Sequence, residues 1–475
     1  KVIDLHLLEK VTMKSDRKLV AHLMRRAGFG ATPSELDRLT SEQTYDEIVE
    51  DLVNPERFDE IDMSYVERYY VGEPVAVHVG KWLYRMANTE RPLEEKMALF
   101  LHHIFPVAWG KSEHGPSLYN EINLFRNVGM TNFGKILLEL SKDPAMIFWL
   151  DNNENHKDEI NENYGRELLE LFSMGVGNYT EDDIKNASRS FTGWTFKQPL
   201  SLYPYGHHEA VFQFLPEDHD YGEKEFLGQR GNFDGGDIIE IIIKQSATAR
   251  FLSRHLYNFF VEDEIQVPSW ETVPPKNPEA IEELTTAFME SRGDMKVVLK
   301  TLFSSEFFKE SSAKPKVKSP TELIVGVIRQ TGEFSRPKPG IHEFAVTTLN
   351  GSAIEGPLAV MGQRLMNPPT VEGWHTGFEW IDSGTLSERV GFVEKQFADP
   401  NKPGVAEMLS KAGSLDDNPE QLVSRCLDLL GALTVSDETL SSLNAYAKTL
   451  SDEKGNAGVH NLIQMAASSV DYQFA

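Results

Sequence analysis

Apolar residues recur at helical spacing along most of this chain. Residues 17–28 and 92–104 carry apolar side chains every three or four positions, and the stretches end with a glycine or with histidines. Thr32 and Thr180 precede two further stretches, and an acidic residue follows each of them three positions later, which predicts a capped helix start. Other stretches with this spacing cover residues 132–150, 160–174, 238–261, 278–291, 295–302, 321–332, 358–366 and 386–398. We therefore expect a mainly α-helical, multi-helix globular body.

A strand-like pattern occurs in one region. Residues 194–215 are rich in aromatic side chains and partly alternate between apolar and polar, which predicts a small β-hairpin-like insertion. Proline and glycine cluster over residues 399–415, which indicates a long loop. The expected organisation is an N-terminal leader segment over 1–16, a main helical domain over 17–400 with a loop-rich insertion at 194–236, and a C-terminal helical segment over 416–475 packed on the main domain.

Composition narrows the classes of partner. Lysine and arginine total 47 against 73 aspartates and glutamates, so the net charge is −26 at pH 7. Such a chain repels phosphate backbones, and without a basic stripe a nucleic-acid partner is not expected. No apolar run reaches the roughly 18 residues of a membrane-spanning helix. The single cysteine, Cys426, excludes an intramolecular disulfide and cysteine-rich metal centres.

Several well-known catalytic motifs do not occur in the sequence. It lacks the HExxH helix of zinc proteases, the GxSxG turn of α/β-hydrolases and a complete phosphate-binding loop. A di-iron carboxylate site needs two Glu-x-x-His pairs, and one pair is present, Glu372 with His375. Any chemistry must therefore come from a less familiar arrangement of polar residues.

The densest polar segment covers residues 151–170. Positions 1, 3, 5 and 12 of a helix-flanked calcium loop would be Asp151, Asn153, Asn155 and Glu162. Position 6, where such loops have glycine, is His156. The alternative is an asparagine-rich loop that caps the following helix.

The helix expected after this loop carries Glu162, Arg166, Glu167 and Glu170. Arg166 is four residues from both Glu162 and Glu170, so it can bridge two carboxylates on one helix face. One interpretation is an ion-pair ladder on the surface, which contributes little stability. The other places these carboxylates on the wall of a cleft, where they bind a metal ion or act as acid and base.

Two further groups are candidates for a site. Glu95 and His102 are seven residues apart and share one face of the 92–104 helix, whereas His103 points elsewhere. His102 is either a packed, hydrogen-bonded histidine or a metal ligand. Residues 218–236 combine acids, a histidine and a lysine with several glycines, which suits a loop around a cation or substrate but equally an ordinary turn-rich loop.

Eight segments stand in a characteristic order along the chain. They are HLMRRAGFGATPSEL (22–36), PLEEKMALFLHHIF (92–105), DPAMIFWLDNNENHKDEINENYGRELLELFSMGVGNYTEDDI (143–184), ASRSFTGW (187–194), HDYGEKEFLGQRGNFDGGDII (219–239), ATARFLSRHLYNFFV (247–261), KVKSPTELIVG (316–326) and MGQRLMNPPTVEGW (361–374). Together they resemble the bacterial family named domain of unknown function 1800, whose members are often exported. The similarity covers about residues 17 to 475.

The resemblance implies that many polar residues form one shared site. The family pattern contains counterparts of Asp151 and Asn152, residues 161–163, Arg166, Glu167, Glu170, His219, Asp220 and Lys224. The family often has a His-x-His pair after the apolar helix; here His102 matches the first histidine and Ile104 stands at the second. This departure weakens the case for a two-histidine metal site.

These observations lead to one expected function and one alternative. We expect an exported protein, periplasmic or on the cell surface, that is a metal-dependent hydrolase of extracellular material. The divalent metal ion, calcium or a transition metal, would lie among His102, Asp151, Asn153, Asn155, Glu162, Glu167 and His219. Arg166 and Lys224 would stabilise anionic charge, and Glu170 or Asp220 would be the general base. The alternative is a non-enzymatic surface, assembly or binding protein with structural calcium, for which a homo-oligomer is expected.

Overall fold

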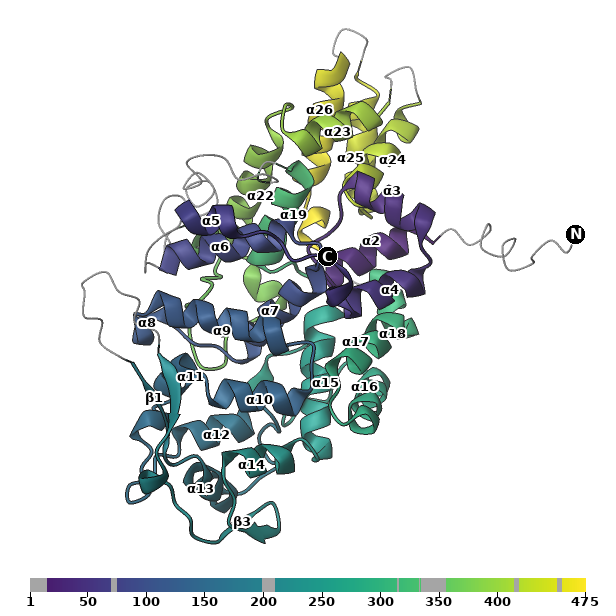
Figure 1. Ribbon diagram of the computed structural model, residues 1–475. Coiled ribbons are helices and arrows are strands. Elements are labelled where there is room, and N and C mark those ends of the chain that lie inside the picture. Colours follow the sequence, from purple (N-terminus) through teal and green to yellow (C-terminus); the bar gives the residue numbers. More distant parts are fainter. Residues whose placement is uncertain are drawn as a thin grey trace, which may run out of the picture.

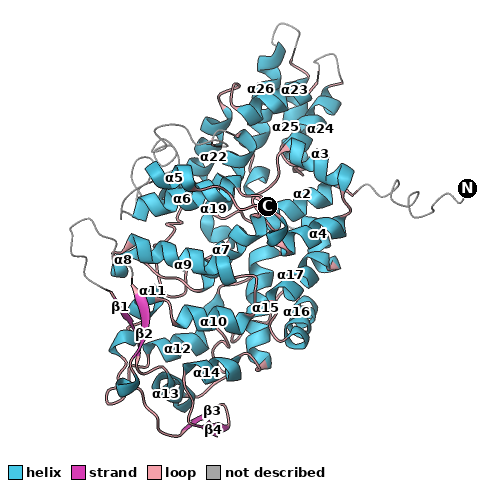
Figure 2. Ribbon diagram, viewed as in Figure 1, coloured by secondary structure: helices cyan, strands magenta, loops and turns pink. Residues whose placement is uncertain are grey.

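The computed structural model is mainly α-helical, as the sequence predicts (Figures 1 and 2). It describes residues 15–69, 75–198, 210–313, 316–332, 334, 356–413, 418–450 and 455–475. Most of the predicted leader segment, residues 1–14, lies outside the described residues. Figure 1 shows an elongated body, with the C-terminal helices at one end and the short strands at the other.

The first part of the chain runs from the middle of the molecule in Figure 1, where α2–α7 lie, to its lower end, where α10–α13 and the strands lie. Its helices are α2 (Arg17–Arg26), α3 (Pro33–Glu42), α4 (Tyr45–Val53), α5 (Ser64–Tyr69), α6 (Val75–Asn88), α7 (Pro92–Ile104), α8 (Trp109–Ser112), α9 (Gly115–Val128), α10 (Phe133–Ser141), α11 (Pro144–Trp149), α12 (Asn163–Glu170) and α13 (Glu181–Ser190). The strands are β1 (Trp194–Lys197), β2 (Val211–Phe214), β3 (Lys224–Phe226) and β4 (Gln229–Gly231).

The remaining elements are again helical. They are α14 (Gly235–Ile242), α15 (Ser246–Phe260), α16 (Pro278–Ser291), α17 (Met295–Ser304), α18 (Glu306–Glu310), α19 (Pro320–Thr331), α21 (Pro357–Val360), α22 (Ser383–Phe397), α23 (Pro403–Lys411), α24 (Pro419–Leu429), α25 (Asp437–Ala447) and α26 (Gly455–Ala467). Short 3-10 turns are η1 (Pro55–Arg57), η2 (Asn152–Glu154), η3 (Pro216–Asp218), η4 (Val267–Ser269), η5 (Ser311–Ala313), η6 (Gly377–Trp380) and η7 (Asp471–Gln473).

The predicted helix starts are confirmed by reciprocal caps. The Thr32 hydroxyl accepts from the backbone N–H of Glu35, and the Glu35 carboxylate accepts from the N–H of Thr32. Thr180 and Asp183 form the same pair of hydrogen bonds at the start of α13. Each pair of reciprocal hydrogen bonds is a capping box, and it satisfies two backbone N–H donors that would otherwise lack a partner at the start of a helix.

Two predicted helices are shorter than their apolar spacing suggests. The expected helix over 160–174 is α12 alone, because the backbone turns after Glu170 and the Leu169 carbonyl accepts from both Met174 and Gly175. The stretch 358–366 contains only α21 and then turns. Gly362 and Met366 both have a positive φ there, which an α-helix does not tolerate.

The predicted hairpin is present, and a second one was not foreseen. β1 pairs antiparallel with β2, and Trp194 stands opposite Phe214. Trp194 is buried and packs edge-on against Phe191 and Phe212, which anchors the hairpin to the body. β3 and β4 form a smaller hairpin within the predicted loop-rich insertion. The residues between the first two strands, 199–209, lie outside the described residues.

One continuous apolar core joins both ends of the molecule. It includes residues from Val20 in α2 to Tyr472 near the end of the chain. α7 lies deep inside it and contacts α6 and α9, which explains why Met97, Phe100 and Leu101 are all fully buried on different faces. Helices α24–α26 pack on one another and on α22 and α23. Within the described part of the chain, no helix combines the length and hydrophobicity that a membrane crossing needs.

Candidate functional site

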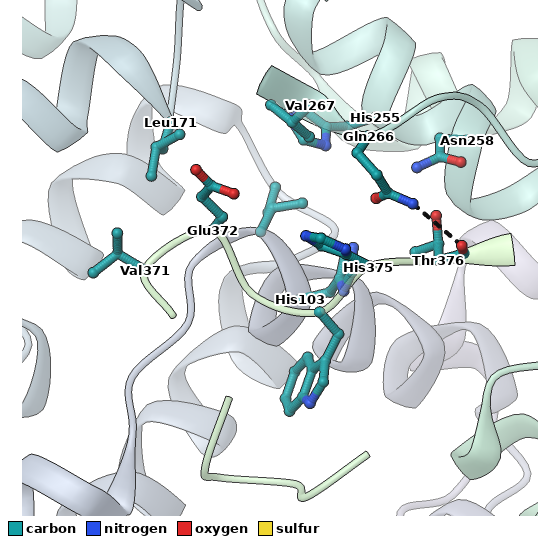
Figure 3. Close-up of a pocket in the computed structure, with 12 residues that line it drawn as sticks. His103, Leu171, His255, Asn258, Gln266, Val267, Val371, Glu372, His375 and Thr376 are labelled. Atoms are coloured by element: carbon teal, nitrogen blue, oxygen red, sulfur yellow. Dashed lines mark hydrogen bonds between the residues drawn. The ribbon is translucent and has the colours of Figure 1, made fainter. Parts of the chain in front are cut away.

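Two adjoining cavities lie between α7, α12, α15 and the loop over residues 370–376. The smaller has a volume of about 20 Å³ and the larger about 290 Å³. Leu171, Val267 and Glu372 line both, so the cavities form one cleft. Figure 3 shows the residues that line the smaller cavity. The small cavity has room for water, which needs about 10–15 Å³. The larger one is near the lower limit, about 300 Å³, of sites for small organic molecules.

Three histidines from three elements line the smaller cavity. They are His103 at the end of α7, His255 in α15 and His375 in the loop. Burial lowers the pKa of His103 to about 4, and nearby Lys316 and His375 lower it further. Burial likewise lowers the pKa of His255 to about 3, with contributions from His103 and Arg254. Both imidazoles are therefore neutral at pH 7, and each can donate one hydrogen bond and accept another.

His255 has a ring nitrogen without a partner. Phe251 and Trp270 pack on this imidazole with ring centroids 4.6 Å away in each case. The residue is only 7% exposed, and its Nε2 atom has no hydrogen-bond partner among the residues that the structure describes. Because a buried polar atom without a partner costs free energy, this nitrogen is a natural point of attachment for a ligand or a water molecule.

Carboxylates form the other side of the cleft. Glu170 and Glu372 line the larger cavity, and Figure 3 shows Glu372 between Leu171 and the histidine rings. Glu167 precedes Glu170 by three residues and Leu171 by four, so all three share one face of α12. Burial raises the pKa of Glu167 to about 7, and Glu170 and Glu372 raise it further by charge repulsion. The Tyr179 hydroxyl donates to Glu170 at 3.1 Å.

The loop reaches the histidines because a glycine allows close contact. Gly373 has a φ of +81°, and a Cβ atom at this position would lie 2.3 Å from the His103 carbonyl oxygen. Trp374 then stacks on His103 at 6.3 Å with an interplanar angle of 11°. This contact places Glu372 and His375 on either side of the point where the loop meets α7.

His102 is packed beside the cleft and hydrogen-bonded to the backbone. Its Nε2 atom accepts from the backbone N–H of Met366 at 3.0 Å, and Trp82 and Trp374 pack edge-on against its ring. Burial lowers its pKa to about 3. The neighbouring Glu95 is paired with Arg126 rather than with a metal ligand. Of the two sequence interpretations of His102, the contacts are those of a packed, hydrogen-bonded histidine.

The asparagine-rich segment forms hydrogen bonds with distant parts of the backbone. The Asn152 amide donates to the carbonyls of Phe191 and Trp194, at 3.3 and 2.8 Å. The Asn155 amide donates to the Ser188 carbonyl at 2.8 Å, while its own oxygen accepts from the N–H of Asn161. These contacts fasten the segment to the end of α13 and the start of β1. Such contacts are expected of an asparagine-rich loop rather than of a calcium-binding loop, because the side-chain oxygen of Asn155 already accepts a hydrogen bond within the protein.

We expect Asn155→Ala to destabilise the protein by about 1–3 kcal/mol, the cost of leaving the buried Ser188 carbonyl without its donor. Chemical denaturation measures this loss. The matched variant is Asn153→Ala, whose amide bonds only to the exposed Glu154, and its expected loss is below about 0.5 kcal/mol. If both variants instead lower calcium affinity equally and leave the calcium-free stability unchanged, the calcium-loop interpretation is correct.

The charged residues of α12 and its preceding loop have partners at the surface. Asp151 pairs with Lys111 at 2.6 Å. Arg166 pairs with Glu181 at 2.8 Å and with Glu162 at 3.4 Å. Arg166 and Glu162 therefore form part of a surface ion-pair arrangement, and Arg166 is also close enough to Glu167 for its positive charge to lower the pKa of that carboxyl.

The loop after the first hairpin is held by its own polar residues. His219 donates from Nδ1 to the Thr192 carbonyl at 2.8 Å. Asp220 pairs with Arg189 at 2.7 Å. Lys224 donates to the carbonyls of Asp220 and Gly222, at 2.5 and 3.2 Å. These contacts are those of a fastened, turn-rich loop, and none of its residues lines the cleft.

The structure does not gather the seven residues predicted to bind metal into one cluster. In the part of the chain that the structure describes, no three side chains of histidine, cysteine, aspartate or glutamate come together so that they could hold a metal ion. His102, Asp151, Asn155, Glu162 and His219 are instead bonded to partners of their own in separate places. Metal binding itself stays a prediction.

Sequence reasoning found one wall of the cleft and missed the other. Glu170, which lines the larger cavity, and Glu167, one turn before it on α12, were among the predicted site residues, whereas His103, His255 and Glu372 were not. The Glu372-x-x-His375 pair was the available signal, but it suggested a di-iron site rather than a cleft wall. His103 does point away from Glu95 and His102, as predicted, and thereby into the smaller cavity.

Comparison with known proteins identifies a family without an assigned activity. The family model described as "Protein of unknown function (DUF1800)" matches residues 22–474, nearly the whole chain. Neither the curated proteins nor the solved structures contain a significant match to the chain. A proposal about its function must therefore come from the cleft.

Proposed function

This chain belongs to the DUF1800 family, whose members have no known function, and we propose that it is a hydrolase that uses general acid–base catalysis. The proposal rests on the geometry of the cleft. The observation that carries the proposal is the meeting of carboxylates and neutral histidines from α7, α12, α15 and one loop around two joined cavities. Acid–base hydrolysis needs groups in opposite protonation states beside a space for substrate, and this arrangement supplies both.

Each group has a role that follows from its environment. Glu167, with a pKa near 7, holds a proton in part of the molecules at neutral pH and is the proposed proton donor to the leaving group. Glu170, which lines the larger cavity, is the proposed general base that activates water. His255 offers its unpartnered Nε2 to the substrate from the smaller cavity.

The remaining residues predicted to be catalytic have no role in the proposed reaction. Arg166, Asp220 and Lys224 line neither cavity, and they are engaged in ion pairs or loop hydrogen bonds. No step is assigned to a metal ion, because the described residues hold no three-ligand cluster for one. Export, and extracellular material as the substrate, stay predictions from the sequence.

We expect the purified chain to hydrolyse at least one class in a panel of nitrophenyl esters, nitrophenyl glycosides, nitrophenyl phosphates and labelled peptides. Glu170→Gln should lower kcat/KM by about 10²-fold or more, the usual contribution of a general base. The rate should also fall as pH rises above about 7, because Glu167 then loses the proton it donates. The matched control is Glu290→Gln, an exposed glutamate on α16, which should retain full activity.

Two results would count against the hydrolase. Activity that is unchanged in Glu170→Gln would place the reaction outside this cleft. Turnover of no substrate class would favour the alternative, a non-enzymatic surface or binding protein.

A further inference from the structure

A third cavity, separate from the cleft, lies where α2, α19 and residues 472–475 meet. Its volume is about 30 Å³, and Arg25, Lys318, Gln330 and Tyr472 contribute to its wall. Figure 1 shows the end of the chain beside α2 and α19. The C-terminal helices thus meet the main body at a point lined by two cationic side chains.

Both of these cations donate hydrogen bonds to backbone carbonyls. Arg25 donates from Nη1 to the Gly431 carbonyl at 2.5 Å. Lys318 donates from Nζ to the Tyr472 carbonyl at 2.7 Å, and its ammonium lies 4.1 Å from the centre of the Tyr472 ring. In the part of the chain that the structure describes, no ion pair joins an acid to Arg25 or Lys318. The one acid in the wall, Glu322, is paired with Lys96.

Further positive charge surrounds the cavity. Burial lowers the pKa of Lys318 well below its ordinary value, and Arg25, Arg389 and Arg26 lower it further by repulsion. Arg389 is fully buried, and its Nη2 atom donates to the Lys318 carbonyl. Its Nη1 atom has no hydrogen-bond partner. Positive groups brought together away from water raise the free energy unless an anion offsets them.

We propose that this cavity binds a small oxoanion, of the size of phosphate or sulfate, between Arg25 and Lys318. A guanidinium and an ammonium form strong charge-assisted hydrogen bonds with oxoanions. The space exceeds the roughly 10–15 Å³ that one water needs, yet it is about a tenth of a site for an organic ligand, near 300 Å³. A bound anion would connect α2 and α19 to the residues before the chain end, and would stabilise their association.

Equilibrium dialysis of the full chain with radiolabelled inorganic phosphate, in chloride buffer of fixed ionic strength, tests this site. We expect one phosphate per chain, and an affinity at least tenfold weaker in both Lys318→Met and Arg25→Gln. The control is Lys411→Met, which removes a lysine paired with Asp37 and Glu407 at the surface and should leave binding unchanged. Failure of one variant to fold leaves the other variant and the wild-type stoichiometry as tests.

The melting temperature provides a second readout. Phosphate should raise it in the wild type with saturation at one site, and this rise should be lost in the two cavity variants. A general salting effect would instead rise without saturation and equally in every variant, which would overturn the proposal. So would the absence of phosphate binding by the wild-type chain in the dialysis.

Discussion

Replacing Glu95 by glutamine is expected to lower the free energy of unfolding by about 3–5 kcal/mol, the usual loss when one partner of a buried ion pair is removed. Glu95 is fully buried in α7, and its two oxygens accept from Arg126 at 2.5 and 3.0 Å. The second oxygen also accepts from the Trp82 indole at 2.9 Å. Glutamine preserves the shape and one acceptor, but leaves the Arg126 guanidinium buried without a counter-charge.

Chemical denaturation measures the loss, with an unchanged dependence on denaturant as the sign that folding stays cooperative. Glu60→Gln is the matched control, because Glu60 pairs with Arg91 while 69% exposed and should contribute below about 1 kcal/mol. The double variant Glu95→Leu with Arg126→Met should be more stable than Glu95→Gln, since no charge is left buried. A loss below about 1 kcal/mol in Glu95→Gln would show that water reaches Arg126.

Replacing Glu121 by methionine is expected to stabilise the protein, and more so at high pH. Glu121 is fully buried in α9, and neither of its oxygens has a hydrogen-bond partner. Burial raises its pKa well above the ordinary value, and Asp143 raises it further. Removing an unsatisfied buried polar group is worth about 1–3 kcal/mol.

The pH dependence follows from proton binding on folding. A carboxyl whose pKa is higher in the folded state keeps its proton there after the unfolded chain has lost it, so the stability falls as pH rises between the two pKa values. For Asp143, whose pKa burial raises from 3.8 to about 7, this window is about pH 4 to 7. Each unit of pH costs about 1.4 kcal/mol per group within its window.

Unfolding free energies at pH 4, 6 and 8 test this expectation. The advantage of Glu121→Met over the wild type should grow with pH, because methionine binds no proton in either state. Glu139→Met on the neighbouring α10 is the control, since Glu139 is a surface residue whose side chain is 38% exposed, and it should give no growing advantage. A Glu121→Met advantage that is equal at all three pH values would mean that Glu121 titrates normally in the folded protein.

Local structure followed closely from the sequence wherever a short-range interaction controls it. The helix starts at Thr32 and Thr180 were predictable because a capping box involves residues only three apart. The hairpin at Trp194 was predictable from its aromatic, alternating pattern. The helix over 160–174 was overestimated, since apolar spacing does not register the turn that begins after Glu170.

The candidate site was predictable only in part. Glu167 and Glu170 could be named because their spacing places them on one helix face. The same reasoning could not show that Arg166 pairs with Glu162 and Glu181 at the surface, whereas Glu170 lines the larger cavity. Glu372 lines the same cleft and shows which face of α12 borders it, but it lies about two hundred residues away in the sequence.

The sequence by itself determined the helical class and the hairpin, because these depend on the periodicity of apolar residues. It also determined the family, because eight segments stand in the family's order along the chain. Only the tertiary structure decided which polar residues share a cavity. His103, His255 and His375 come together because a glycine lets the 370–376 loop touch the end of α7. The side chains of Asn155, His219 and Lys224 instead donate hydrogen bonds to backbone carbonyls and hold their loops in place. A buried polar side chain must find a partner, and packing decides whether that partner is a nearby carbonyl or an open cavity.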